Sequence, residues 1–313
     1  MSFNRIAIHG HRGWVGSAVL KALASTGAPI TVLHRAGSDV SNLPSGVTAV
    51  EVDLDDSKTL IPALRDIDIA ISFAAREIVA KQRAFIEAIP RTNVKLFVPS
   101  DFSFNVDEQG LQIAANKTKR DVEDAAKAAG VPITTIWCGC FTESTLAFPI
   151  LGIDDTGNRL VVTGDSLNQQ LSLCSRNYVA AAYASIFAQT PPEQLQGRYI
   201  GISELKATGD EIAAALTEKH GAKTQTFTHT IERVDDEIAQ AVASGSPTGL
   251  SWYCRKAWGT GAIVPGIGRD IWEVQGYKKA SLRELLIDGK LEPYKDMSPQ
   301  TRALFYGIFH DMS

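Results

Sequence analysis

The sequence predicts an α/β protein built on a Rossmann-type, doubly wound parallel sheet, with a smaller α+β region after it. Three observations support this fold class. Short β-branched runs alternate with helix-length segments in the first half of the chain, a glycine-rich turn follows the first run, and the alternation loosens after Phe141. Strands that are separated by helix-length crossovers pair in parallel, so the first half predicts one sheet with helices on both faces.

Six strands are predicted from runs rich in valine, isoleucine and threonine. The run from Ile67 to Ile71 is nearly continuous in apolar residues, which is typical of a strand covered on both faces. The predicted strands are Arg5–His9, Ile30–His34, Val47–Val52, Ile67–Ser72, Lys95–Pro99 and Ile133–Trp137. The helices predicted between them are Trp14–Ser25, Ser57–Asp66, Ile78–Ala88 and Ala114–Ala129.

The second half of the chain has a looser pattern. Thr208 and Glu211 form a capping box ahead of a helix, and Gly221 stands where a helix-ending glycine is expected. The predicted elements are a hairpin-like stretch at Gly157–Gly164, helices at Asn177–Gln189, Asp210–His220, Ile231–Ala243 and Ser281–Ile287, and a strand at Arg198–Ile202. We therefore expect a nucleotide-binding-type region over residues 1–150 and a capping region over residues 151–313, part of which returns to the sheet.

Composition narrows the classes of function. The 313 residues carry a formal net charge of −4, which offers no electrostatic footprint for nucleic acid or for an anionic membrane. No run of eighteen apolar residues occurs, and the N-terminus leads straight into a strand, so we expect neither a membrane span nor a signal peptide. The four cysteines and six histidines lack metal-ligand spacing. These features predict a cytoplasmic protein without a metal. We expect it to be a monomer or a homodimer, a choice that the sequence leaves open.

The glycine-rich turn is the strongest motif. Gly10, Gly13 and Gly16 follow the first strand with two residues between successive glycines, and an amphipathic helix begins directly after them. In this arrangement the first glycine allows the tight turn, the second admits the pyrophosphate close to the backbone, and the third lets the helix pack near the sheet. The pyrophosphate then lies on the helix N-terminus, where free N–H groups favour an anion. The motif predicts a bound nicotinamide dinucleotide.

The end of the second strand indicates which dinucleotide is bound. His34 and Arg35 stand where an NAD-binding protein places an acidic residue for the ribose 2′-hydroxyl. A guanidinium there suits the 2′-phosphate of NADP(H), although Arg35 is also compatible with a solvated loop position. Asp53, after the third strand, is a candidate neighbour of the adenine or a surface turn residue.

Lys119 is the candidate catalytic residue. No Tyr-x-x-x-Lys pair occurs in the chain, so proton transfer must use another group. Helical phase places Lys119 in a stripe with Ala115, Val122 and Ala126, directed inward. A partly desolvated lysine can act as a general acid or base, whereas the alternative is a lysine that lies along the helix edge with its charge in water.

Several motifs together resemble the NmrA-like and isoflavone-reductase-like family of atypical short-chain dehydrogenases. They are the glycine turn, His34-Arg35, Phe97-Val-Pro99-Ser100-Asp101-Phe102, Lys119, Gly130-Val-Pro-Ile-Thr134 and Phe141. In the reductases of this family a catalytic lysine stands eleven residues before such a glycine, as Lys119 does here. Asp101 replaces the family's usual glutamate, and Ser103 replaces its glycine.

The glycine turn, the strand ends and this resemblance together define the expected site. Its cofactor contacts are Gly10, Arg12, Gly13, Trp14, Val15, Gly16, His34, Arg35, Asp53, Phe73, Ala74, Ala75, Pro99, Ser100, Asp101, Phe102, Lys119, Cys138 and Phe141. Its substrate contacts are Phe102, Phe141, Trp252, Tyr253 and Trp258.

Three functions are compatible with these features. The first is an NADPH-dependent reductase of a small aromatic or polyketide-like secondary metabolite, with Lys119 managing the proton. The second is a regulator that senses NAD(P) without chemistry and signals to a protein partner, a function that the NmrA-like side of the family includes. The third, a sugar-nucleotide epimerase, is disfavoured because the Tyr-x-x-x-Lys pair is missing.

Overall fold

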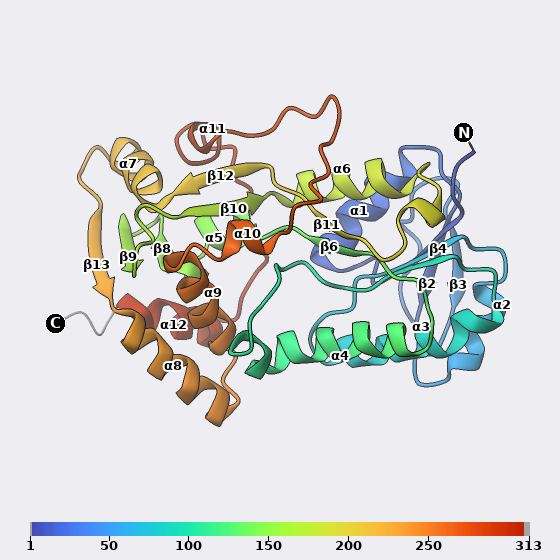
Figure 1. The fold of residues 1–313 in the computed structure, drawn as a ribbon. Coiled ribbons are helices and arrows are strands. Elements are labelled where there is room, and N and C mark those ends of the chain that lie inside the picture. Colours follow the sequence, from blue (N-terminus) through green and yellow to red (C-terminus); the bar gives the residue numbers. More distant parts are fainter. Residues whose placement is uncertain (1, 310–313) are drawn as a thin grey trace.

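The first part of the chain forms the predicted parallel sheet (Figure 1). The structure is a computed structural model and describes residues 2–309, except for the side chains of Arg76 and Glu77. Residues 310–313 of the expected capping region therefore lie outside it. The strands are β1 (Ile6–His9), β2 (Ile30–His34), β3 (Thr48–Glu51), β4 (Ile69–Ser72), β5 (Leu96–Val98) and β6 (Thr135–Trp137). Five of them pair in the order β3-β2-β1-β4-β5.

The sheet continues beyond β5. An isolated parallel bridge joins Phe97 to Ile133, just ahead of β6. β6 then pairs in parallel with β11 (Tyr199–Gly201), a strand from the second half of the chain.

Helices cover both faces of the sheet, as the alternation predicted. α1 (Trp14–Ala24) and α6 (Arg176–Phe187) pack on one face, while α2 (Leu60–Ala63), α3 (Arg83–Ala88) and α4 (Ala114–Ala128) pack on the other (Figure 1). Two predicted helices differ in detail. The first turn of 57–66 is the 3-10 turn η1 (Ser57–Thr59), and α3 follows a longer 3-10 segment, η2 (Arg76–Gln82).

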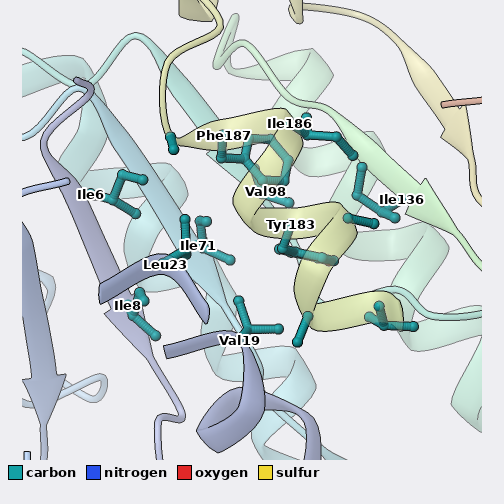
Figure 2. Packing of buried hydrophobic residues seen from close by; sticks show 14 of the residues in the cluster. Ile6, Ile8, Val19, Leu23, Ile71, Val98, Ile136, Tyr183, Ile186 and Phe187 are labelled. Atoms are coloured by element: carbon teal, nitrogen blue, oxygen red, sulfur yellow. The ribbon is translucent and has the colours of Figure 1, made fainter. Parts of the chain in front are cut away.

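Alternation along each strand divides the core between the two faces. Ile6 and Ile8 of β1 point to the α1–α6 side, whereas Ala7 between them points to the α3–α4 side. β5 behaves in the same way, since Val98 faces α6 and Phe97 faces α4. Figure 2 shows strand residues meeting side chains of α1 and α6 on the first face. Both faces of the central strands are therefore buried, which positions their carboxyl ends rigidly.

The second part of the chain has its own core and smaller sheets. Its strands are β7 (Cys140–Phe141), β8 (Ile153–Asp154), β9 (Arg159–Thr163), β10 (Gln170–Cys174), β12 (Leu205–Thr208) and β13 (Gln225–His229). They form two sheets, β12-β10-β7 and β13-β9-β8. The helices are α5 (Thr142–Leu146), α7 (Gly209–His220), α8 (Ile231–Ser244), α9 (Gly249–Gly259), α10 (Ile263–Gly266), α11 (Leu282–Leu286) and α12 (Pro299–Tyr306).

The helix-capping motifs predicted in this part of the chain are confirmed. The capping box of Thr208 and Glu211 is formed, and Gly221 ends α7 with φ +63°. The stretch 249–259, for which no element was predicted, forms the helix α9, and β10, β12, β13 and α12 were not predicted either. None of the helices within residues 2–309 has the length and apolar character to cross a membrane.

Candidate functional site

The glycine turn is built as the motif requires. Gly10 has φ +84°, and a Cβ there would lie 2.8 Å from the carbonyl oxygen of Phe73 at the end of β4. A Cβ on Gly16 would lie 2.2 Å from the carbonyl oxygen of Gly10. Both positions therefore exclude a side chain. Gly13 caps α1 without any side-chain hydrogen bond, so the first N–H groups of α1 remain available for an anion.

The position of this turn within the sheet suits a dinucleotide. β1 lies between β2 and β4, where the direction of strand addition reverses. Ligands of open α/β sheets bind in the crevice outside the carboxyl ends of the strands at such a point.

Four aromatic side chains expected in the site meet one another across these strand ends. The rings of Phe73 and Phe102 lie 5.9 Å apart, those of Phe102 and Phe141 5.8 Å, and those of Phe141 and Trp14 5.1 Å. They come from the ends of β4, β5 and β7 and from the start of α1. The structure thus brings the four into one continuous aromatic row. Tyr294, from the C-terminal segment, packs on Trp14 at 5.2 Å.

A cavity of about 740 Å³ adjoins the outer side of the glycine turn. It lies between α1 and residues 39–45, and His11, Arg12 and Lys21 contribute to its lining. Nε2 of His11 is buried there without a hydrogen-bond partner. Cavities of several hundred Å³ are the usual size for cofactor sites.

Arg35 extends from the end of β2 as an exposed side chain. None of the carboxylates whose side chains the structure describes pairs with it. His34 beside it contacts the carbonyl oxygen of Arg35 through Nδ1 at 3.0 Å. The guanidinium is therefore available to an external anion, which fits a 2′-phosphate.

The other expected cofactor residues have mixed environments. Asp53 is exposed, and its Oδ1 accepts a hydrogen bond from the backbone of Asp55, so it organises a turn. Ala74 is buried and Ala75 exposed. Cys138 is fully buried, and its thiol donates to the carbonyl oxygen of Phe102 while burial raises its pKa. These contacts give Cys138 a packing role rather than an exposed contact surface.

Gln82 supports the end of β5, and the sequence analysis did not identify it. This side chain is fully buried, and its Oε1 accepts the backbone N–H of Ser100 at 2.8 Å. It fixes the stretch Pro99–Asp101 at the sheet edge. A glutamine in a helical segment carries no sequence signal for this role.

Lys119 reaches the same strand end. Its Nζ donates to Oδ1 of Asp101 at 3.1 Å, and Nε1 of Trp137 donates to Oδ2 at 3.3 Å. The Lys119 side chain is 25% exposed and that of Asp101 12%. An ammonium is thus held by a carboxylate at the edge of the site.

The buried face of α4 differs from the apolar stripe that helical phase predicts. Its buried face consists of Asn116, Val122, Glu123 and Ala126, while Ala115 is exposed. Polar residues can occupy this face because they have partners. Glu123 accepts from Thr135 and Tyr199 at 2.9 and 3.1 Å, although burial raises its pKa. Periodicity of apolar residues could not foresee these bonds, and it places Lys119 at the edge of the buried face.

The cavity beside Lys119 is small. It measures about 20 Å³, which is room for about one water molecule. Residues of the loop after β5, including Phe104 and Val106, cover it, together with Arg120.

The expected substrate contacts Trp252, Tyr253 and Trp258 belong to the core of the second part of the chain. Trp258 is fully buried with its Nε1 bonded to the carbonyl oxygen of Gln169, so it is not a ligand wall. Trp252 stacks on His229 at 5.8 Å and is 8% exposed. Tyr253 stacks on Phe104 at 6.2 Å, and its hydroxyl accepts the N–H of Asp107. Only Tyr253, through Phe104, lies next to the Lys119 cavity.

Glu143 is a buried acid that the sequence analysis missed. It lies on α5 two residues after Phe141 and is 2% exposed. Burial, as the largest cause, raises its pKa to about 7. The sequence signal for a buried acid was a single carboxylate among the apolar and hydroxyl-bearing residues of 141–146.

The described residues fit a dinucleotide and show no metal centre. Within residues 2–309, no three His, Cys, Asp or Glu side chains gather as metal ligands. The open N-terminus of α1, the unpaired Arg35 and the aromatic row are suited to a pyrophosphate, a 2′-phosphate and a planar ring, respectively. The fold and this edge define a Rossmann-type nucleotide-binding protein.

The chain belongs to the NmrA-like family, whose sequence model matches residues 2–245. Among curated proteins, eugenol synthase 1 of Petunia hybrida is 32% identical over 52% of this chain and 58% of its own length. The isoflavone reductase homolog IRL of Zea mays is 28% identical over 92% of this chain and 94% of its own length. Some of the matches thus span little more than half of the relative, while others span nearly all of it.

Solved structures show the same fold. A crystal structure of isoflavone reductase superposes with a TM-score of 0.71 at 22% identity, covering 91% of this chain and 99% of that one. The complex of leucoanthocyanidin reductase with NADPH from Vitis vinifera gives 0.69 at 17% identity, covering 92% and 96%. The expected family and Rossmann-type α/β fold are confirmed.

Proposed function

We propose that this protein is an NADPH-dependent reductase of a small aromatic or polyketide-like secondary metabolite. The observation that carries the proposal is a convergence at one sheet edge. The glycine turn follows β1, Phe73 of the aromatic row follows β4, and Asp101, which holds Nζ of Lys119 from α4, follows β5, and these three strands are neighbours in the sheet. The names of the relatives, eugenol synthase and isoflavone reductase homolog, support a reductase of aromatic metabolites.

The cofactor site follows from the same residues. NADPH would place its pyrophosphate on the N-terminus of α1 and its 2′-phosphate beside Arg35, and it would supply a hydride. The aromatic row, from Trp14 to Phe73, would border the nicotinamide and a planar substrate. Holding the two rings in register contributes much of a rate enhancement, on the order of 7–11 kcal/mol in well-oriented reactions.

Lys119 would hold the proton. Its Nζ is paired with Asp101, which keeps the ammonium oriented while the substrate gains negative charge. A positioned proton donor contributes roughly 10²–10⁴-fold to rate. Because the cavity at Lys119 admits about one water molecule, the loop after β5 must move before a substrate ring reaches Nζ.

The same small cavity favours the second candidate function. A dinucleotide-sensing regulator needs the glycine turn but no open space at Lys119. The two functions differ in one measurable property, which is turnover.

The test is consumption of NADPH by the purified chain with a panel of aromatic enones, imines and benzylic ethers, followed at the nicotinamide absorbance. We expect turnover with at least one class, and loss of about 10²-fold or more in Lys119→Met. Lys119→Met should still bind NADPH. Binding of NADP⁺ and NADPH with equal affinity and no turnover across the panel would establish the sensor instead.

A further inference from the structure

A buried carboxyl oxygen without a partner belongs to Glu143, which follows Phe141 of the aromatic row by two residues. Oε1 of Glu143 accepts the backbone N–H of Arg176 at 2.8 Å, at the start of α6. Oε2 of the same side chain is buried and has no hydrogen-bond partner. A buried oxygen left unmatched costs about 1–3 kcal/mol, so one that persists calls for a physical reason.

The surroundings of Glu143 connect it to the site. Phe141, two residues earlier, packs on the ring of Trp14 at 5.1 Å. The guanidinium of Arg176 lies over the same ring at 5.7 Å, and its Nε is also buried without a partner. Glu143 and Arg176, which are joined by a hydrogen bond, thus each carry a buried polar atom without a partner, and Arg176 also contacts Trp14, the first residue of α1.

A second buried acid at the same helix start shows what a structural role looks like. Glu204 is 7% exposed, and both of its oxygens are occupied. Oε2 accepts from the N–H of Ser175 at 2.7 Å, and Oε1 accepts from the N–H of Ala280 at 3.2 Å. Glu143 differs from Glu204 because one of its two carboxyl oxygens has no hydrogen-bond partner.

We propose that Oε2 of Glu143 is a specificity contact that accepts a hydrogen bond from a hydroxyl group on the substrate's aromatic ring. This inference rests on the proposed function, because it takes the aromatic row as the place where the ring lies. An acceptor in an apolar site discriminates strongly against a ligand that lacks the donor, because the buried acceptor is then left unpaired. A methyl ether in place of the hydroxyl is such a ligand.

Protonation of Glu143 would change this preference. Burial raises its pKa to about 7, and nearby Glu204 and Glu292 act in the same direction. Arg176 from α6 and Tyr277 from the C-terminal segment also face this region. Above this pKa Oε2 is an acceptor, whereas below it the carboxyl can donate. The preference for a hydroxyl over a methyl ether should therefore be larger at about pH 8 than at about pH 6.

The experiment uses 2-naphthol and 2-methoxynaphthalene as probes of the full chain, by titration calorimetry in the presence of NADP⁺. At about pH 8 we expect 2-naphthol to bind about tenfold more tightly. Glu143→Gln keeps an oxygen for the N–H of Arg176 and turns an NH₂ donor towards the ligand. The variant should lose the preference at both pH values.

Glu204→Gln is the matched control, since it removes a buried charge at the same helix start but no free oxygen. It should keep the preference for 2-naphthol, even if it lowers the melting temperature. A Glu143→Gln protein that is folded by circular dichroism and still prefers 2-naphthol overturns the inference, as does a wild-type protein that binds neither probe or binds both equally. Failure of NADPH to bind or react would overturn the proposed function separately.

Discussion

Single residues at the strand ends determine which ligands this edge of the sheet can hold. Arg35 is exposed at the end of β2, and it has no partner among the carboxylates whose side chains the structure describes. A planar guanidinium binds a phosphate by two parallel hydrogen bonds but gives a ribose hydroxyl no acceptor. The choice between NADP(H) and NAD(H) should therefore depend on this one side chain.

Arg35→Glu tests this dependence. We expect NADPH to bind at least about tenfold more weakly, because a charge-assisted contact is replaced by repulsion, and NADH to bind as well as before or better. Fluorescence titration of both nucleotides measures the change. Arg91→Glu, an equal change of charge on an exposed 3-10 turn, is the control. Equal losses in the two variants would show that general charge, not a 2′-phosphate contact, sets the affinity.

At the scale of elements, two glycines of the turn between β1 and α1 differ in what a side chain would disturb. At Gly16 it would disturb the packing of α1, and at Gly13 it would mainly disturb the binding of a ligand. A Cβ on Gly16 meets the carbonyl oxygen of Gly10 at 2.2 Å, so α1 would have to move away from the sheet. A Cβ on Gly13 meets the same oxygen at 3.1 Å and nothing else within 4 Å. Gly16 is therefore required by the fold, whereas we propose that Gly13 is required by a ligand that approaches the backbone.

Alanine substitutions should separate these two roles. Gly16→Ala is expected to lower the free energy of unfolding by about 2 kcal/mol or more, through strain of the overpacking type. Gly13→Ala should cost less, about 1 kcal/mol, because alanine is a poorer N-cap residue than glycine, yet it should weaken NADPH binding about tenfold or more. Urea unfolding and nucleotide titration measure the two effects. Unchanged NADPH affinity in a stable Gly13→Ala protein would contradict the proposed pyrophosphate site.

The sequence predicted those elements whose signals are local or periodic. The six strands of the parallel sheet and the α7 capping box came from β-branched runs and from Thr208 with Glu211. The strands β10, β12 and β13 depend on pairing with distant segments, which no local pattern records. The site was predictable where motifs specify backbone geometry, as at Gly10. It was not predictable at Glu143 or Gln82, whose roles arise from contacts with residues 33 and 18 positions away.

At the scale of the whole molecule, the second half of the chain is not a separate cap. β11 joins the parallel sheet through β6, and α6 packs with α1 over the sheet's first face (Figure 2). The remaining elements form a second core around α9, with β13 and α8 beside it. Because β11 and α6 connect the two parts, a substitution that weakens the second core should also lower the stability of the parallel sheet.

His229 gives the second core a dependence on pH. It is 1% exposed, and burial, with Arg255 nearby, lowers its pKa to about 4. Its Nδ1 accepts from Nη2 of the fully buried Arg255 at 2.8 Å. In the unfolded chain a histidine titrates near 6.5. Between about pH 6.5 and about pH 4 the unfolded chain therefore binds a proton that the folded protein does not, and acid lowers the free energy of unfolding.

His229→Asn should flatten this part of the pH profile, because an asparagine oxygen can accept from Arg255 but cannot take up a proton. In the wild type we expect His229 to contribute a loss of up to about 3 kcal/mol as pH falls through this window. Urea unfolding at about pH 7.5, 6 and 5 gives the difference between the two proteins. The variant should be less stable at neutral pH, where it loses packing on Trp252, and should approach or overtake the wild type at low pH. Two profiles that stay parallel would show that His229 has the same pKa in the folded and the unfolded chain, and that its burial does not couple folding to pH.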